Sequence, residues 1–240
     1  MPAGKQDHTV KRFDQEMERL QNLIMEMGGL VEDQIHQAVT ALYDEDITLA
    51  REVSARDHRV NALEVKIDEE IINMIALRQP MASDLRMVFA LSKSVTDLER
   101  IGDEAEKIAR MTIHLYEDGS SAPQTRLLRD VQNMAQLASS MLRSSLDSLA
   151  RLDADRALNI TRGDSELDEH FRDALRRLIT YMMEDPRTIG QAIDVLFIVK
   201  ALERIGDHAK NIAEYIVFLV KGKDIRHLSD KAAQDIVEGL

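Results

Sequence analysis

The 240-residue chain is acidic, free of cysteine and poor in aromatic residues. It carries 43 Asp and Glu against 31 Lys and Arg, a formal net charge of −12, so it lacks the positive charge that drives direct nucleic-acid binding or adhesion to an anionic membrane. The lack of Cys excludes disulfides, thiolate metal sites and cysteine nucleophiles, and it fits a reducing compartment. With 4% aromatic residues and no Trp, the composition favours helices over a β-sandwich.

Hydropathy gives no sign of a membrane-inserted segment. The N-terminal sequence has no apolar stretch of the signal-peptide type, and the longest apolar run, Tyr215 to Val220, is too short to span a bilayer. We therefore expect a cytoplasmic protein without direct membrane insertion. A membrane-bound partner could still recruit it to the inner face of the membrane.

Helix-breaking stretches divide the chain into long helical segments. Runs rich in Pro, Gly, Asp and Ser occur at 79–83, 117–123 and 184–187. Asp residues at two softer turns, 44–46 and 152–155, can cap the helices that follow them. The predicted helices span 8–44, 46–79, 83–117, 125–152, 155–184 and 187–221, with frayed residues at 1–7 and a short extra turn at 229–238.

The chain is internally duplicated. Residues 98–109 read LERIGDEAEKIA, and residues 202–213, 104 positions later, read LERIGDHAKNIA. Upstream, a weaker match continues at an offset of 107 residues. We therefore expect an all-α fold of two tandem, pseudo-symmetric three-helix bundles, at 8–117 and 125–221, followed by a C-terminal tail at 222–240.

The third helix of each copy has apolar residues at heptad spacing, which is typical of bundle packing. Gly102 and Gly206 fall inside these apolar stripes, where Gly costs about 1 kcal/mol relative to Ala in helix propensity. Close approach of a neighbouring helix is the expected compensation. The pair Gly28-Gly29 is a candidate kink in the first helix.

Acidic residues follow one flank of the second and third helices in both copies. Glu99 and Asp103 lie four residues apart on the third helix, and Glu203 and Asp207 repeat the pattern. On the second helices the same flank carries Asp57, Asn61 and Glu64 in the first copy, and Asp164 and Asp168 in the second. Helices joined by a short turn run antiparallel, so the register predicts that these flanks face each other at one level.

Carboxylates brought together in this way repel each other unless a cation, a proton or separation into water relieves them. Oxygen ligands suit Mg, Ca, Mn or Fe, and the lack of Cys argues against a structural zinc site. The pattern predicts one metal-binding patch per copy, formed by Glu99, Asp103 and Asp57 in the first and by Glu203, Asp207, Asp164 and Asp168 in the second. A solvated acidic stripe is the alternative interpretation.

Three further features have both a functional and a structural interpretation. Arg100 and Arg204 occupy outward positions and could bind phosphate or a carboxylate of a partner, or they could simply be solvated. His208, which replaces Glu104 in the second copy, could add a nitrogen ligand or could be a surface histidine. The apolar run 215–220 could be a partner surface or part of the core.

Motifs of known catalytic sites are missing from the sequence. It has no P-loop, no G-x-G-x-x-G, no nucleophile elbow and no H-E-x-x-H. None of the seven His residues follows a Glu by three positions, so the ligand pattern of ferritin-like di-iron oxidases is missing too. These absences favour a binding protein over an enzyme.

The doubled motif, DLERIGDEAEKIA and KALERIGDHAKNIAE, together with MGGLVEDQIHQAV and RQPMASDLR, resembles the PhoU family of phosphate-transport regulators over nearly the whole chain. The resemblance implies a PhoU fold and negative regulation of the phosphate-starvation response and of phosphate uptake. The implied partners are the ATPase subunit of the phosphate ABC transporter, a membrane sensor histidine kinase and a second copy of the chain. The resemblance also implies that iron, zinc or other metals bind at the Glu-x-x-x-Asp motifs.

The two copies differ at several positions of the implied metal sites. Asp97 is matched by Ala201, Glu64 by Phe171, and Asn61 by Asp168. The two patches are therefore not chemically equal, and their metal occupancy can differ. Two alternatives to a regulator remain open at this point: a metal-storage protein or metal-dependent enzyme that uses the same carboxylates, and a structural adaptor.

Overall fold

The computed structural model describes residues 4–117 and 123–239, and within these ranges the chain forms helices and turns without a β-strand. The helices are α1 (Gly4–Tyr43), α2 (Ile47–Arg78), α3 (Ser83–Glu117), α4 (Val131–Arg151), α5 (Ala154–Glu184), the 3-10 turn η1 (Pro186–Thr188), α6 (Ile189–Lys221) and α7 (Asp230–Glu238). The predicted all-α class is confirmed.

Most predicted helix boundaries are correct to within a few residues, and the caps explain why. The side chain of Asp46 accepts a hydrogen bond from the backbone N–H of Leu49 at 2.9 Å, and Asp153 does the same for Arg156, so each Asp starts a helix as expected. Part of the predicted linker, 118–122, lies outside the described residues, as do residues 1–3 of the predicted frayed end. The prediction of fraying is wrong for residues 4–7, which belong to α1.

The predicted start of the fourth helix at residue 125 is wrong. Residues 124–130 form consecutive turns, in which Leu127 N–H donates to Gln124 O at 2.8 Å and Leu128 N–H donates to Thr125 O at 3.2 Å. Leu127 and Leu128 are buried, and the hydroxyl of Tyr43 donates to Leu128 O at 3.0 Å. This segment is therefore held by contacts with α1, which no local sequence pattern encodes.

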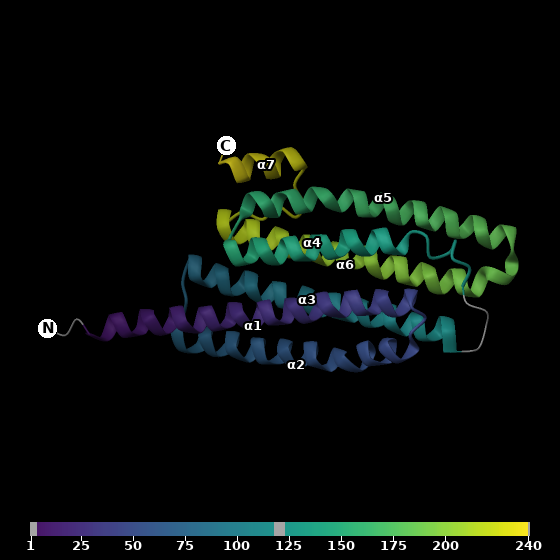
Figure 1. Ribbon diagram of the computed structural model, residues 1–240. Helices are drawn as coiled ribbons and strands as arrows, with labels where there is room; N and C mark the ends of the chain where they lie inside the picture. The colour runs from purple at the N-terminus through teal and green to yellow at the C-terminus, as the bar shows by residue number, and fades with distance from the viewer. Residues whose placement is uncertain (1–3, 118–122, 240) are drawn as a thin grey trace.

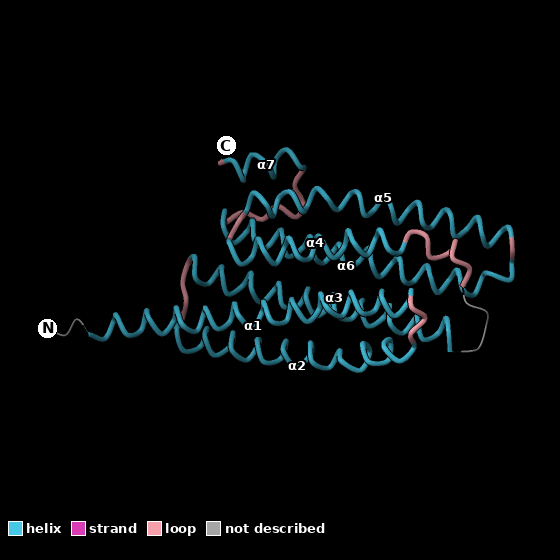
Figure 2. Tube along the Cα trace, viewed as in Figure 1, coloured by secondary structure: helices cyan, strands magenta, loops and turns pink. Residues whose placement is uncertain are grey.

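The helices form two layers, one made of α1, α2 and α3 and the other of α4, α5 and α6 (Figure 1). The layers meet mainly through α3 against α6, and also through α1 against α4. In the tube view the long helices run roughly side by side, with α2 and α5 on the outside and α7 beyond α5 (Figure 2). Buried apolar side chains from both layers form one continuous core.

Three glycines lie where a neighbouring helix approaches closely. A methyl group at Gly102 would lie 3.3 Å from Val60 Cγ1 on α2, and one at Gly206 would collide with Leu167 on α5. The expected close approach at both motif glycines is thus confirmed. A methyl group at Gly28 would lie 2.7 Å from Leu146 on α4. The close approach of α4 therefore explains why a Gly stands in the middle of α1, which continues as a single helix through this position.

Among the described residues, no helix combines the length and the apolar character needed to cross a membrane.

Candidate cation sites and the polar contacts between the bundles

The first acidic patch lies between α2 and α3 and consists of Asp57, Glu64, Glu99, Asp103 and Glu106. The register predicted from the sequence is confirmed, because these carboxylates are close enough to act on one another. Burial and the charge of Asp103 raise the pKa of Asp57, and burial together with Asp103 and Glu64 raises the pKa of Glu99. Burial and the charge of Glu106 likewise raise the pKa of Asp103. The patch therefore concentrates negative charge.

The floor of this patch holds buried polar atoms without hydrogen-bond partners. Gln34 of α1 is only 3% exposed, and neither its Oε1 nor its Nε2 has a partner among the described residues. The amide lies near enough to Asp57 to oppose the rise in its pKa, yet the geometry falls short of a hydrogen bond, and Asp57 Oδ1 is also unpaired. Both oxygens border Gly102: a methyl group there would lie 3.4 Å from Asp57 Oδ1 and 3.5 Å from Gln34 Oε1.

The second acidic patch lies between α5 and α6 and consists of Asp164, Asp168, Glu203 and Asp207. Here too the predicted register is confirmed: burial, Glu203 and Asp164 raise the pKa of Asp207 to about 6. Unlike the first patch, this one contains ammonium groups. Lys200 Nζ lies 2.7 and 2.6 Å from the two carboxylate oxygens of Glu203, and Lys210 Nζ lies 2.7 Å from Asp164 Oδ2.

Sequence reasoning missed Lys200, Lys210 and Gln34. The signal that could have found them is the offset between the copies, which pairs Lys200 with Thr96 and Lys210 with Glu106. The upstream offset pairs Gln34 with Met141, and the structure agrees, since Met141 Sδ borders Gly206 as Gln34 borders Gly102.

Hard cations such as Mn²⁺ and Mg²⁺ fit the donor set of the first patch, which offers carboxylates and one amide oxygen. Within the described part of the chain, no three His, Asp or Glu side chains already converge at metal-binding distance. The residues that would hold a metal ion here are the half-buried Glu99 and the exposed Asp103, together with Asp57 and its unpaired oxygen. In the second patch the lysines already occupy Glu203 and Asp164, so that donor set fits a metal poorly.

Polar side chains also join the two bundles where α3 meets α6. His208 Nδ1 lies 2.7 Å from Asp97 Oδ1, and Asn211 donates to the same oxygen at 3.1 Å. The interpretation of His208 as a surface histidine is wrong, because it is 7% exposed. Arg204 lies 2.9 Å from Glu104 Oε1 on α3, so its predicted outward position faces the other bundle. Arg100 is exposed.

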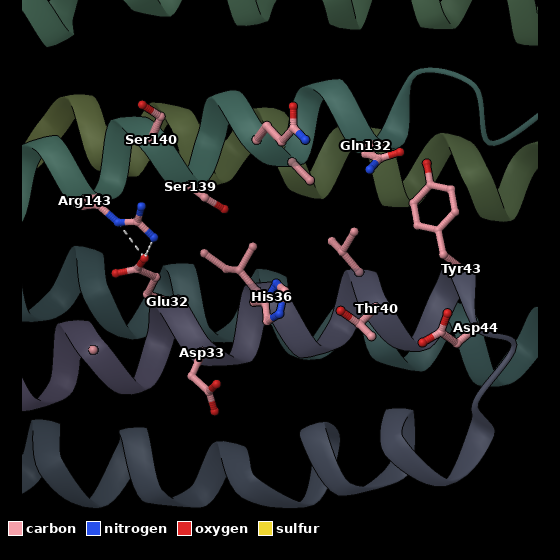
Figure 3. A pocket seen from close by; sticks show the side chains of 15 residues that line it. Glu32, Asp33, His36, Thr40, Tyr43, Asp44, Gln132, Ser139, Ser140 and Arg143 are labelled. Carbon is pink, nitrogen blue, oxygen red and sulfur yellow. Dashed lines mark hydrogen bonds and ion pairs between the residues drawn. The ribbon is translucent and has the colours of Figure 1, made fainter.

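A groove of about 780 Å³ runs between α1 and α4. Figure 3 shows Tyr43 at one end and Glu32 with Arg143 at the other. Arg143 Nε donates to Glu32 Oε1 at 2.8 Å, so these opposite charges already satisfy each other. The groove therefore lies along a seam between the bundles and is also lined by Asp33, His36 and Asp44. The apolar run 215–220 lies in α6, away from this groove. Its predicted role in the core is confirmed at Ile216, Val217 and Leu219, which are buried.

Comparison with known proteins gives a consistent result. A model of the PhoU domain matches residues 24–112 and 131–216. A "phosphate-specific transport system accessory protein PhoU homolog" from Pseudomonas putida is 46% identical over 232 residues, which is 97% of this chain and 90% of that protein.

Two solved structures share the fold. A crystal structure of PhoU from Pseudomonas aeruginosa has a TM-score of 0.84 and 46% identity, covering 88% of this chain and 100% of that one. A crystal structure of the "phosphate transport system regulatory protein PhoU" from Streptococcus pneumoniae has a TM-score of 0.80 and 29% identity, covering 88% of this chain and 98% of that one.

Proposed function

Because this chain belongs to the PhoU family, we propose that it is a non-enzymatic negative regulator of phosphate uptake and of the phosphate-starvation response. The observation that carries the proposal is similarity along 88–97% of the chain to proteins named as accessory or regulatory components of phosphate transport.

The partners we propose are the ATPase subunit of the phosphate ABC transporter and a phosphate sensor histidine kinase, which the protein couples in the cytoplasm as a homodimer. Exposed apolar side chains at two hairpin tips support a role through protein contacts. At the α2–α3 tip Met81 is 78% exposed, in the second turn of α3 Phe89 is 52% exposed, and at the α5–α6 tip Met183 is 80% exposed. Apolar side chains that cluster in contact with water are typical of interaction surfaces.

We also propose that a metal ion such as Fe, Mn, Mg, Ca or Zn binds at the acidic residues that line the bundles. Support comes from the mutual repulsion within the first acidic patch and from the unpaired oxygens of Asp57 and Gln34. A bound cation would neutralise the carboxylates and give the buried oxygens a partner.

Deletion of the gene tests the regulatory role. In a cell grown at high phosphate, a reporter behind a phosphate-repressed promoter should become active when the gene is deleted, and the intact gene supplied on a plasmid should silence it again. Continued repression in the deletion strain would contradict the proposal.

The same strain separates regulation from metal binding. A plasmid copy with Glu99→Ala and Asp103→Ala should restore repression less well than the intact gene if the metal supports regulation. As a control, Glu18→Ala changes an exposed carboxylate on α1 that belongs to neither patch, and it should restore repression fully.

A further inference from the structure

We propose that the two acidic patches are neutralised by different cations: the second carries its own in Lys200 and Lys210, whereas the first is left open to an external divalent metal ion that Asp57 and Gln34 help to bind. This inference rests on the metal-binding part of the proposed function and adds which patch takes the metal. Four pairs of equivalent positions in the two copies support it: Thr96 and Lys200, Glu106 and Lys210, Glu64 and Phe171, and Gln34 and Met141.

In the second patch, the lysines sit where a metal ion would otherwise be needed. Lys200 contacts both oxygens of Glu203, at 2.7 and 2.6 Å, and its ammonium lies 5.1 Å from the centre of the Phe171 ring. The carboxylate and the aromatic face hold the charge in place from two sides. Lys210 bridges α6 to Asp164 on α5, with an N–O distance of 2.7 Å.

The first patch lacks both ammonium groups and has additional negative charge in their place. Thr96 stands where the second copy has Lys200, and Glu106 stands where it has Lys210. Glu64 takes the place of Phe171, the ring over which Lys200 lies. Each of these differences makes the first patch more negative than the second. The cations that remain beside it are the exposed guanidinium groups of Arg100 and Arg110, the latter 3.6 Å from Glu106 Oε2.

The buried residues beneath the two patches also differ: the first patch has a polar residue there and the second has an apolar one. Gln34, 3% exposed and unpaired at both polar atoms, borders Gly102, whereas Met141 borders Gly206 at the equivalent place. A buried amide without a partner is costly, and an apolar side chain avoids that cost. The amide oxygen of Gln34 and the unpaired Asp57 oxygen both border Gly102, and they offer a cation two buried ligands of a kind that Met141 cannot supply in the second patch.

The ligand chemistry defines the kind of ion. Carboxylate and amide oxygens without nitrogen or sulfur favour hard divalent cations, so Mn²⁺ is a suitable probe. Isothermal titration of MnCl₂ into chelator-treated protein should therefore detect binding to the intact chain. Exchanging the paired residues between the copies then locates that binding.

Two double variants make the exchange. Thr96→Lys with Glu106→Lys places the lysines of the second patch in the first, and it should lower Mn²⁺ affinity at least about tenfold. Lys200→Thr with Lys210→Glu removes them from the second patch, and it should add Mn²⁺ binding beyond that of the intact chain.

Matched controls make the same changes in charge at exposed positions outside both patches. Thr125→Lys with Glu18→Lys controls for the first exchange, and Lys66→Thr with Lys231→Glu controls for the second. Both should bind Mn²⁺ like the intact chain. A loss of affinity in the first control equal to that in the first exchange would mean that only the overall charge matters, and it would overturn the inference.

A third variant remains informative if the exchanges unfold the protein. Gln34→Met gives the first patch the floor of the second, and it should weaken Mn²⁺ binding while the metal-free protein stays at least as resistant to urea as the intact chain. Unchanged Mn²⁺ affinity in this variant would overturn the role of Gln34.

The Mn²⁺ titrations distinguish a wrong assignment of the patches from a protein that binds no metal at all. If Mn²⁺ binds the intact chain but is lost on Asp207→Asn and retained with Thr96→Lys and Glu106→Lys, the assignment of the patches is wrong while metal binding stands. If Mn²⁺ binds none of the proteins, metal binding and this inference both fall. The regulatory role is decided separately by the reporter in cells.

Discussion

His208 of α6 meets Asp97 of α3 at 2.7 Å across the boundary between the two bundles, and both side chains are buried. The contact has no pseudo-symmetric copy, because Ala201 replaces Asp97 and Glu104 replaces His208 in the other half. Asn211 donates to the same carboxylate oxygen of Asp97 at 3.1 Å. One carboxylate thus satisfies two side chains of the opposite bundle, the buried His208 and the half-buried Asn211.

Asp97→Ala should therefore destabilise the protein. It leaves the buried His208 and the half-buried Asn211 without their acceptor, and a hydrogen bond to a charged group is worth about 1.5–3 kcal/mol. The free energy of unfolding, measured by urea titration, should fall by about that amount.

Two comparisons test the cause. Asp173→Ala removes an exposed carboxylate that lies 3.7 Å from Arg176, and it should change stability by less than about 1 kcal/mol. Asp97→Ala combined with His208→Ala should cost less than the sum of the two single changes. Additive costs would contradict a direct interaction between the two residues.

A second prediction concerns the glycine of the second motif. Gly206→Ala should destabilise the protein by about 1–3 kcal/mol, because the added methyl group would collide with Leu167 of the adjacent helix. Gly29→Ala is the matched control, since nothing lies within 4 Å of its added methyl group and α1 continues through it. It should stabilise the helix by up to about 1 kcal/mol. Thermal unfolding of the two variants should shift the midpoint in opposite directions.

The features that sequence could predict are those fixed by local periodicity. Heptad spacing places Gly102 and Gly206 against neighbouring helices, and short turns fix which residues of adjacent helices stand opposite each other. For the same reason the acidic residues of both patches meet as expected, with Asp207 close enough to Asp164 and Glu203 for its pKa to rise.

The features that sequence did not predict depend on how the bundles pack together. The heptad pattern of α6 places Arg204 outward from its own bundle, but α3 covers that face and supplies Glu104. His208 is buried for the same reason. The start of α4 is also decided by contact with another helix, through Tyr43 and Leu128. Lys200 differs from these cases, because comparison of the two copies alone would have revealed it.

The third prediction is that stability depends on pH through two carboxyl groups of α6, those of the buried Glu214 and the half-buried Asp207. Burial raises the pKa of Glu214 from 4.5 to about 7, although Lys210 and Arg226 oppose the rise. Burial, Glu203 and Asp164 raise the pKa of Asp207 to about 6. Both groups therefore hold protons in the folded protein at pH values where the unfolded chain has released them.

The sign of the effect follows from proton linkage. Between about pH 4.5 and 7 the folded state binds more protons than the unfolded state at Glu214, so its contribution to the free energy of unfolding falls as the pH rises. Each unit of pKa difference corresponds to about 1.4 kcal/mol. The contribution is largest below pH 4.5 and is lost as the pH passes about 7.

Glu214→Gln isolates this contribution, because the amide is neutral at every pH. Relative to the intact chain, the variant should gain stability at pH 8 and show little difference at pH 4.5, when urea unfolding is measured at both values. Glu238→Gln, at an exposed position in α7, should leave the pH profile unchanged. If the difference between Glu214→Gln and the intact chain is the same at both pH values, Glu214 keeps its ordinary pKa in the folded protein and its burial has no effect on proton binding.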